Sequence, residues 1–239
     1  MAGFLALGLI IGMAHALEAD HLAAVGTMAE KGGNSSRRLA WLGASWGIGH
    51  TTTLFLLSLP VLLLGFVMTA RIEAGLEFGV GVMLVVLGIT VFVRLRRKKV
   101  HFHLHEHEDG ARHFHAHSHA SAQRPHSRDS HDHGHKSLFS RRSYLVGLVH
   151  GAAGSAGLVA MAAAASQDLS VTLLHILLFG LGSTLGMALL TMIASWPLRR
   201  AEAAAGRTFT LLQGGMACGA VVVGIGVLAS AGPVMLGIG

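Results

Sequence analysis

Six long apolar stretches dominate this sequence and limit what it can fold into. Each is longer than the ~20 residues that an α-helix needs to cross the hydrocarbon core of a bilayer. They cover residues 2–28, 39–66, 72–93, 143–165, 169–196 and 208–231. Only 13% of the residues are charged, whereas a water-soluble domain has about 25%. The sequence therefore predicts an all-α integral membrane protein with six transmembrane helices.

The Lys and Arg residues are distributed unevenly between the loops. Arg71 alone lies between the second and third spans, and all the others lie after spans one, three and five. Because positively charged loops stay in the cytoplasm, we expect both termini outside and the long third loop inside the cell. The net charge of +6 is then a property of membrane loops, and no nucleic acid partner is expected. The predicted location is the cytoplasmic (inner) membrane, where the lipid bilayer is the first partner.

The two halves of the sequence repeat each other. Three pairs of strings correspond in order at a nearly constant spacing: GMAH (12–15) with GLVH (147–150), WGIGHT (46–51) with FGLGST (179–184), and GVGVMLVVLGI (79–89) with GMACGAVVVGI (215–225). Because each copy has an odd number of spans, the second copy would be inverted, as in many secondary transporters. We expect three parts: a first three-helix repeat at 1–94, a loop at 95–142 and a second repeat at 143–239. A duplication kept only for packing is the alternative.

The first span carries four ionisable side chains: His15, Glu18, Asp20 and His21. Such groups are costly in a bilayer and are therefore candidates for function. On a straight helix, His15, Glu18 and His21 share one face and Asp20 lies on the other side. Asp20 would then contact another helix or support the site, or the helix would unwind to bring it in. Nitrogen and oxygen ligands suit Ni²⁺, Co²⁺ or Zn²⁺, whereas Cu⁺ prefers sulfur. The alternative is a polar cluster that only fixes helix packing.

Three more histidines lie in later spans. His50, in Gly-Ile-Gly-His-Thr, is expected to be the third imidazole of the site. His150 is the repeat partner of His15, but its half lacks the carboxylates, so it is a secondary candidate at the periphery or a transient stop. His175 has no polar context and is expected to pack. The predicted metal ligands are His15, Glu18, Asp20, His21 and His50, with His150 as the secondary candidate.

These motifs resemble the nickel/cobalt transporter family of bacterial permeases. The resemblance rests on His15-x4-Asp20-His21, on GIGHT (47–51), and on the strings GLVHGAAGSAGL (147–158) and FGLGSTLGMALL (179–190), which are most similar to its urease-accessory branch. It implies that His15, Asp20 and His21 recognise metal. The chain departs from the best-known permeases, which have eight spans and a second acidic motif. A related efflux branch has six spans and a His-rich loop.

The third loop is rich in histidine and poor in apolar residues. We expect it to be disordered without metal, because it cannot bury a core. Its histidines, with nearby carboxylates, would buffer, deliver or sense cytoplasmic metal; an inert tether is the alternative. The histidines are His101, His103, His105, His107, His113, His115, His117, His119, His126, His131, His133 and His135.

Three functions are compatible with these features. The favoured one is a secondary transporter that takes up Ni²⁺, or Co²⁺, to supply a metalloenzyme such as urease or hydrogenase, with cytoplasmic metallochaperones as further partners. An efflux permease for the same ions is the second, and a membrane metal sensor or chaperone platform is the third. We expect no enzyme and no prosthetic group. No His-Glu-x-x-His occurs in a span and no Walker-type motif occurs anywhere, so neither a zinc peptidase nor an ATPase is indicated.

Overall fold

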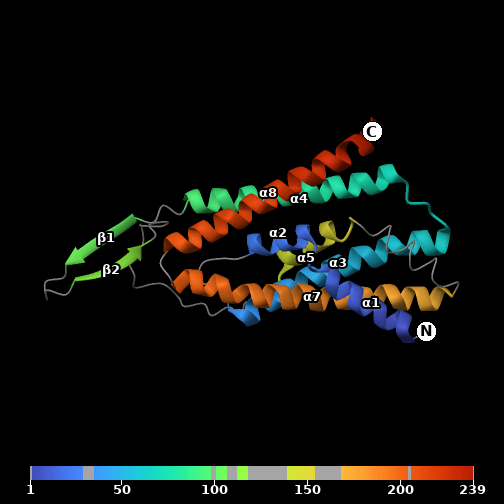
Figure 1. The fold of residues 1–239 in the computed structure, drawn as a ribbon, viewed down its shortest axis with the longest axis horizontal. Helices are drawn as coiled ribbons and strands as arrows, with labels where there is room; N and C mark the ends of the chain where they lie inside the picture. The colour runs from blue at the N-terminus through green and yellow to red at the C-terminus, as the bar shows by residue number, and fades with distance from the viewer. Residues whose placement is uncertain are drawn as a thin grey trace, which may run out of the picture.

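The computed structural model describes residues 2–28, 35–97, 101–106, 112–117, 139–153, 168–203 and 206–238. Helices dominate these segments (Figure 1). In chain order the elements are α1 (Ala2–His15), α2 (Ala19–Met28), α3 (Ser36–Leu64), α4 (Ala70–Arg97), β1 (His101–Glu106), β2 (Arg112–His117), α5 (Arg141–His150), α7 (Leu169–Ala203) and α8 (Gly206–Leu236).

Within the described ranges, the helices α3, α4, α7 and α8 are each long and apolar enough to cross a membrane. The bent pair α1 and α2 makes a fifth candidate span. Many large apolar side chains on these helices are exposed, among them Ile10 and Val86, as expected for surfaces that face lipid. The chain is therefore a multi-pass helical membrane protein. Of the predicted span 143–165, only the beginning is described, as α5, so the sixth span stays a prediction.

The helices pack in two groups (Figure 1). In one group α4 packs along α8; in the other α3 packs along α7, with α1 against α7 and α5 against α3. The short helix α2 contacts α4 and α8 of the first group and α7 of the second, and α7 also contacts α8 directly. Buried residues from both groups, such as Trp46, Leu84 and Met187, belong to one core cluster. The second part of the broken first span, α2, thus lies between the two groups (Figure 1).

Residues that correspond in the two halves make corresponding contacts. A Cβ atom at Gly12 would collide with the carbonyl of Phe179, and one at Gly147 would collide with the carbonyl of Trp46. Each glycine lets its helix approach the neighbouring backbone closely, which is how helices associate in lipid. Where α3 crosses α7, the hydroxyl oxygens of Thr51 and Thr184 lie 3.1 Å apart. These contacts join residues of the paired strings, and the inverted repeat itself stays a prediction.

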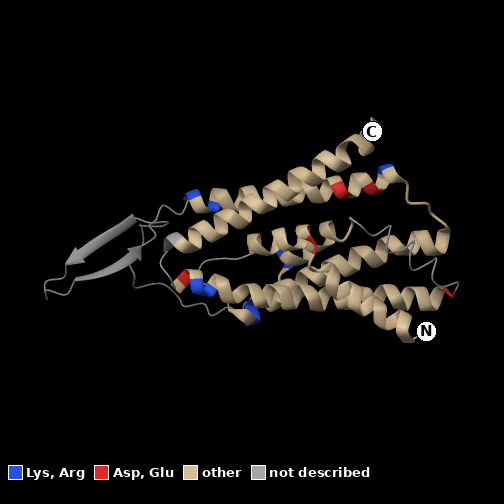
Figure 2. Ribbon diagram, in the orientation of Figure 1, with Lys and Arg blue, Asp and Glu red and all other residues tan. Residues whose placement is uncertain are grey.

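The basic residues of the described helices gather at one end of the bundle (Figure 2). This is the end where α3 begins and where α4 and α7 end. Both chain termini lie toward the opposite end (Figure 1), where α4 begins with Ala70 and Arg71. This separation of charge along the bundle agrees with the loop distribution of Lys and Arg in the sequence.

Two short strands occur within the predicted loop. β1 and β2 pair antiparallel, with His101 opposite His117 and Glu106 opposite Arg112. His-x-His alternation has the two-residue period of a strand. These two segments lie in the loop and outside the membrane helices, so the helical architecture of the bundle is unaffected. The other residues of the loop lie outside the described ranges, so disorder there stays a prediction.

Candidate metal centre

The predicted first span is broken in the middle of its polar motif. α1 ends at His15, and α2 begins at Ala19 with its axis turned by 56°. Across the break, the backbone N–H groups of Leu17 and Glu18 donate to the carbonyls of Ala14 and His15, three residues back. A straight helix across the motif is therefore wrong. The sequence left open whether the helix unwinds locally near Asp20, and in the structure it does, between His15 and Ala19.

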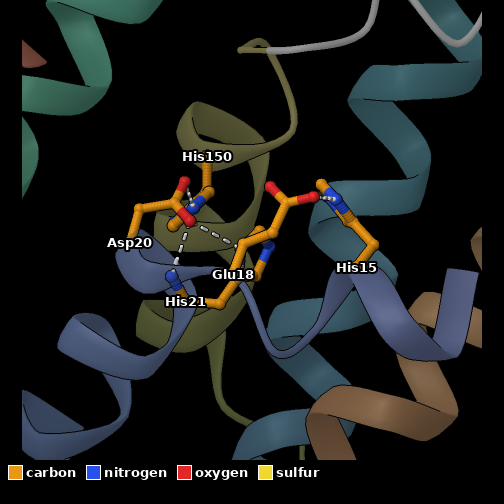
Figure 3. A network of polar contacts seen from close by, with 5 residues as sticks. All are labelled: His15, Glu18, Asp20, His21 and His150. Atoms are coloured by element: carbon orange, nitrogen blue, oxygen red, sulfur yellow. Dashed lines mark hydrogen bonds and ion pairs between the residues drawn. The ribbon is translucent and has the colours of Figure 1, made fainter.

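Each carboxylate of the motif contacts an imidazole (Figure 3). Oε1 of Glu18 lies 2.7 Å from Nδ1 of His15, and Oδ1 of Asp20 lies 3.0 Å from Nδ1 of His21. An ionised carboxylate only accepts, so both Nδ1 atoms donate and both Nε2 atoms keep their lone pairs. Glu18 has 57% of its side-chain surface exposed, whereas His21 is 1% exposed. The carboxylates thus fix the tautomers of a partly buried imidazole, His15, and a buried one, His21.

His50, on α3, brings a third imidazole to this pair. Its ring centroid lies 5.1 Å from that of His15 and 5.4 Å from that of His21. One ligand nitrogen from each of the three lies within 4.8 Å of the others. Among the described residues, Nε2 of His15, Nε2 of His21 and both ring nitrogens of His50 are buried without a hydrogen-bond partner. Buried polar atoms normally have partners, so these converging nitrogens could hold a metal ion.

His150 lies in the cluster and not at its edge, which differs from the sequence expectation. Its Nε2 lies 2.8 Å from Oδ2 of Asp20, and its ring centroid lies 4.2 Å from that of His21. Asp20, His21 and His150 form a second group with ligand atoms within 4.8 Å. Asp20 therefore bridges the two halves of the chain. The missing carboxylates of the second half led to the peripheral interpretation, but the first half supplies the carboxylate across the interface.

Two aromatic residues that the sequence analysis did not assign to the site enclose it. The ring centroid of Trp46 lies 5.3 Å from that of His21, and Phe179 lies 5.3 Å from His15. Both are buried, and they occupy corresponding positions of the repeated strings. The sequence contains a feature that could have identified them, because each directly precedes a Gly-x-Gly that allows close helix approach.

The remaining histidines lie apart from this cluster or cannot be described. His175 is buried between α7 and α1, where its ring stacks on Phe4 at 4.1 Å and its Nδ1 donates to the Phe4 carbonyl. His101, His103, His105, His113, His115 and His117 lie in β1 and β2, and the other loop histidines lie outside the described residues. Metal buffering by the loop stays a prediction.

Comparison with known proteins points to the same family as the sequence motifs. The chain is 31% identical over 198 residues to the urease accessory protein UreH of Bacillus sp. (strain TB-90). The match covers 82% of this chain and 78% of UreH, so it extends into both membrane halves. No family model matches the chain, and no solved structure matches it. On this identity and coverage, the chain belongs to the UreH-like, urease-accessory branch of the nickel/cobalt transporter family.

Proposed function

We propose that this protein is a secondary transporter that takes up Ni²⁺, with Co²⁺ as the second substrate, across the cytoplasmic membrane. The metal would supply a metalloenzyme such as urease or hydrogenase, with hand-over to cytoplasmic metallochaperones. The observation that carries the proposal is the convergence of unpartnered nitrogens from His15, His21 and His50 inside a membrane bundle. The relative's name, urease accessory protein UreH, supports a role in nickel supply.

We propose that the three imidazoles are the primary ligands of the ion. Neutral imidazole suits Ni²⁺ and Co²⁺, and the donated Nδ1 protons of His15 and His21 leave both Nε2 atoms available. Glu18 and Asp20 then act mainly by orienting these rings, in the way that carboxylates support metal-bound histidines elsewhere. Direct oxygen ligation by either carboxylate, which the sequence suggests, would require a side-chain rotation away from its histidine.

Asp20 and His150 would link ion binding to the second half. Asp20 accepts from His21, a proposed ligand, and contacts His150 on α5 with its other oxygen. Movement of the His21 ring when the ion binds or leaves would therefore shift Asp20 and change its contact with His150 in the other half. This supports His150 as a residue of the transport pathway, either as an alternating ligand or as the anchor of Asp20.

We also propose that the halves 1–94 and 143–239 are inverted repeats with both termini outside. The corresponding contacts at Gly12 and Gly147, and the Thr51–Thr184 contact between equivalent residues, support a shared internal axis. The gathering of Lys and Arg at one end of the helices supports a cytoplasmic location for that end and for the loop 95–142. Substrate sites at the interface of such repeats are typical of secondary transporters.

The alternatives are efflux of the same ions and metal sensing without transport. Ligand geometry is the same for uptake and efflux, so the urease-accessory relative is what favours uptake. The histidine cluster within the membrane bundle disfavours a pure sensor, because a sensor needs only the loop.

Accumulation of ⁶³Ni²⁺ in cells tests the proposal. Cells that express the protein should accumulate more ⁶³Ni²⁺ than cells without it, and cells that express His21→Ala should accumulate no more than the empty control. His175→Asn is the matched control, because His175 is another buried membrane histidine outside the cluster; it should transport normally at equal membrane content. Reduced accumulation with the unaltered protein would indicate efflux, and unchanged accumulation with bound metal would indicate a sensor.

A further inference from the structure

The hydroxyl of Ser183, on α7, is a buried polar group that takes part in none of the contacts described above. Ser183 is 0% exposed, and among the described residues its Oγ has no hydrogen-bond partner. Other buried hydroxyls of the long helices, such as those of Ser58 and Thr191, donate to carbonyl oxygens of their own helix. A buried hydroxyl without a partner is costly, so the oxygen of Ser183 is available to a bound ligand.

Ser183 lies between the two sides of α7 that pack on α1 and on α3. On one side, a Cβ at Gly186 would contact the backbone of Met13 on α1. On the other side, the hydroxyl oxygen of Thr184 lies 3.1 Å from that of Thr51 on α3. At 3.6 residues per turn, the direction of residue 183 falls between these two sides. Ser183 therefore faces the space between α1 and α3.

That space holds two of the proposed ligands. Phe179, one turn before Ser183 on the same side of α7, has its ring centroid 5.3 Å from that of His15 at the end of α1. The ring of His15 in turn lies 5.1 Å from that of His50 on α3. The packing of α7 therefore places Ser183 beside the pair His15 and His50.

The sequence repeat gives the same placement. Ser183 corresponds to His50 in the paired strings FGLGST (179–184) and WGIGHT (46–51), and His15 corresponds to His150. The ring centroids of His50 and His150 lie 6.1 Å apart. The corresponding pair is Ser183 and His15, so the second half would contribute a hydroxyl where the first half contributes an imidazole.

We propose that the hydroxyl oxygen of Ser183 accepts a hydrogen bond from a water bound to the ion, and that this contact favours Ni²⁺ over Zn²⁺. The inference rests on the proposed function, in which His15, His21 and His50 are the ligands. A metal-bound water can donate its protons, and a serine hydroxyl can accept. Ser183 is then a positioning residue, because it acts on the ion through the water.

The preference for Ni²⁺ follows from the geometry that each ion takes. Zn²⁺ prefers four ligands in a tetrahedron, which three imidazoles and one free water can complete. Ni²⁺ with nitrogen and oxygen ligands prefers a square-planar or tetragonal shell. A water that is held in a fixed direction from α7 therefore stabilises bound Ni²⁺ more than bound Zn²⁺.

Thermal unfolding of the full-length, detergent-solubilised protein tests this inference, because an ion that binds the folded bundle raises its Tm. The unaltered protein, Ser183→Ala, Ser58→Ala and His21→Ala are each titrated with Ni²⁺ and, separately, with Zn²⁺. Ser58→Ala is the matched control, because Ser58 is another fully buried serine and its hydroxyl already donates to the carbonyl of Phe55.

Ser183→Ala should need about tenfold more free Ni²⁺ for the same rise in Tm, the low end of the range for groups that support metal ligands. Its response to Zn²⁺ should be nearly unchanged, because the tetrahedral shell does not need the held water. Without metal its Tm should be equal or higher, because an unpaired buried hydroxyl has been removed. Ser58→Ala should respond to both ions like the unaltered protein, and His21→Ala should respond to neither.

Each outcome decides the role of Ser183. A weaker Ni²⁺ response that is confined to Ser183→Ala supports it. An unchanged Ni²⁺ response, an equal loss in Ser58→Ala, or an equal loss for Zn²⁺ overturns it. A lower metal-free Tm with an unchanged Ni²⁺ response assigns Ser183 to packing and also overturns it. If Ser183→Ala does not fold, Ser183→Gly, which also lacks the hydroxyl, takes its place under the same criteria.

His21→Ala separates this inference from the proposed function. Loss of the Ni²⁺ response in His21→Ala together with a normal response in Ser183→Ala overturns the role of Ser183 and leaves the proposed ligands intact. A normal Ni²⁺ response in His21→Ala contradicts the proposed ligands, and the role of Ser183 is then overturned with them.

Discussion

The two carboxylates of the first span have different surroundings, and this difference governs what each contributes. Glu18 is 57% exposed and contacts only the ring of His15 among the described residues, whereas Asp20 is 24% exposed and joins His21 to His150. A hydrogen bond to an exposed carboxylate is worth less than one in a buried network. Asp20 is therefore expected to matter more than Glu18, although the two are alike in chemistry.

Replacement of Glu18 by Gln should have a small effect on metal binding. The Gln side-chain oxygen can still accept from Nδ1 of His15, so the ring keeps its orientation and its free Nε2. The Ni²⁺ affinity of purified protein, measured by equilibrium binding, should fall less than about tenfold. His15→Ala, which removes a proposed ligand, should lose much more. Equal losses in Glu18→Gln and His15→Ala would identify Glu18 as a direct ligand.

Replacement of Asp20 by Asn should weaken metal binding by about 10- to 100-fold, the range for groups that orient metal ligands. Asn has one acceptor oxygen and presents an amide N–H₂ on its other side, so it cannot accept from both His21 and His150. Asp168→Asn is the control, because Asp168 accepts from backbone N–H groups at the start of α7 and Asn serves equally well there. An unchanged Ni²⁺ affinity in Asp20→Asn would contradict the orienting role.

The residues of the candidate site could be named from the sequence, but which of them contact each other could not. Ionisable groups in an apolar span are conspicuous, and His50 stands beside the glycines of its motif. The position of Asp20 depends on the break between α1 and α2, because a continuous helix would turn its side chain away. The role of His150 depends on packing between the halves, which spacing within one span does not encode.

At the scale of helices, the backbone contacts depend on glycines that share a position in the repeat. The helices α1 and α5 each approach a long helix at a glycine, at Gly12 against α7 and at Gly147 against α3. Apolar length alone predicted the long helices α3, α4, α7 and α8, with ends that differ by up to seven residues from the expected ones. It could not predict the bend of the first span, because the bend depends on local hydrogen bonds and on packing.

Gly12→Ala should destabilise the protein, whereas Gly79→Ala should not. A Cβ at Gly12 would collide with the Phe179 backbone, but one at Gly79 has no atom within 4 Å. Overpacking costs about 1–3 kcal/mol, while Ala at an open helical position gains up to ~1 kcal/mol over Gly. Thermal unfolding of the detergent-solubilised variants should therefore give a lower Tm for Gly12→Ala and an equal or higher Tm for Gly79→Ala.

The repeat supplies a second comparison of the same kind. Gly147→Ala should behave like Gly12→Ala, and Gly215→Ala like Gly79→Ala, since a Cβ at Gly215 would also have no atom within 4 Å. Agreement between the two pairs would show that corresponding contacts carry corresponding energies. A Tm for Gly147→Ala equal to that of Gly215→Ala would contradict the corresponding roles.

At the scale of the whole molecule, the proposed metal centre belongs mainly to the first half and is closed by the second. His15, His21 and His50 come from α1, α2 and α3, whereas His150 and Phe179 come from α5 and α7. None of these residues belongs to the His-rich loop 95–142. The bundle and the loop can therefore be separated by experiment.

Deletion of residues 101–135 should leave the initial rate of Ni²⁺ transport largely intact, because the centre and the helices that hold it remain. The basic residues that flank the deletion, among them Arg94 and Arg142, also remain, so the orientation of the protein should be kept. The loss of twelve histidines should instead lower the number of ions bound per protein and change the tolerance of cells to excess nickel. The initial rate of ⁶³Ni²⁺ uptake and the number of bound metal ions are measured on the same variant. His21→Ala is the comparison with the reverse expectation: its transport rate should vanish, while its loop should still bind metal. A deletion variant that inserts correctly but does not transport would make the loop part of the transport path.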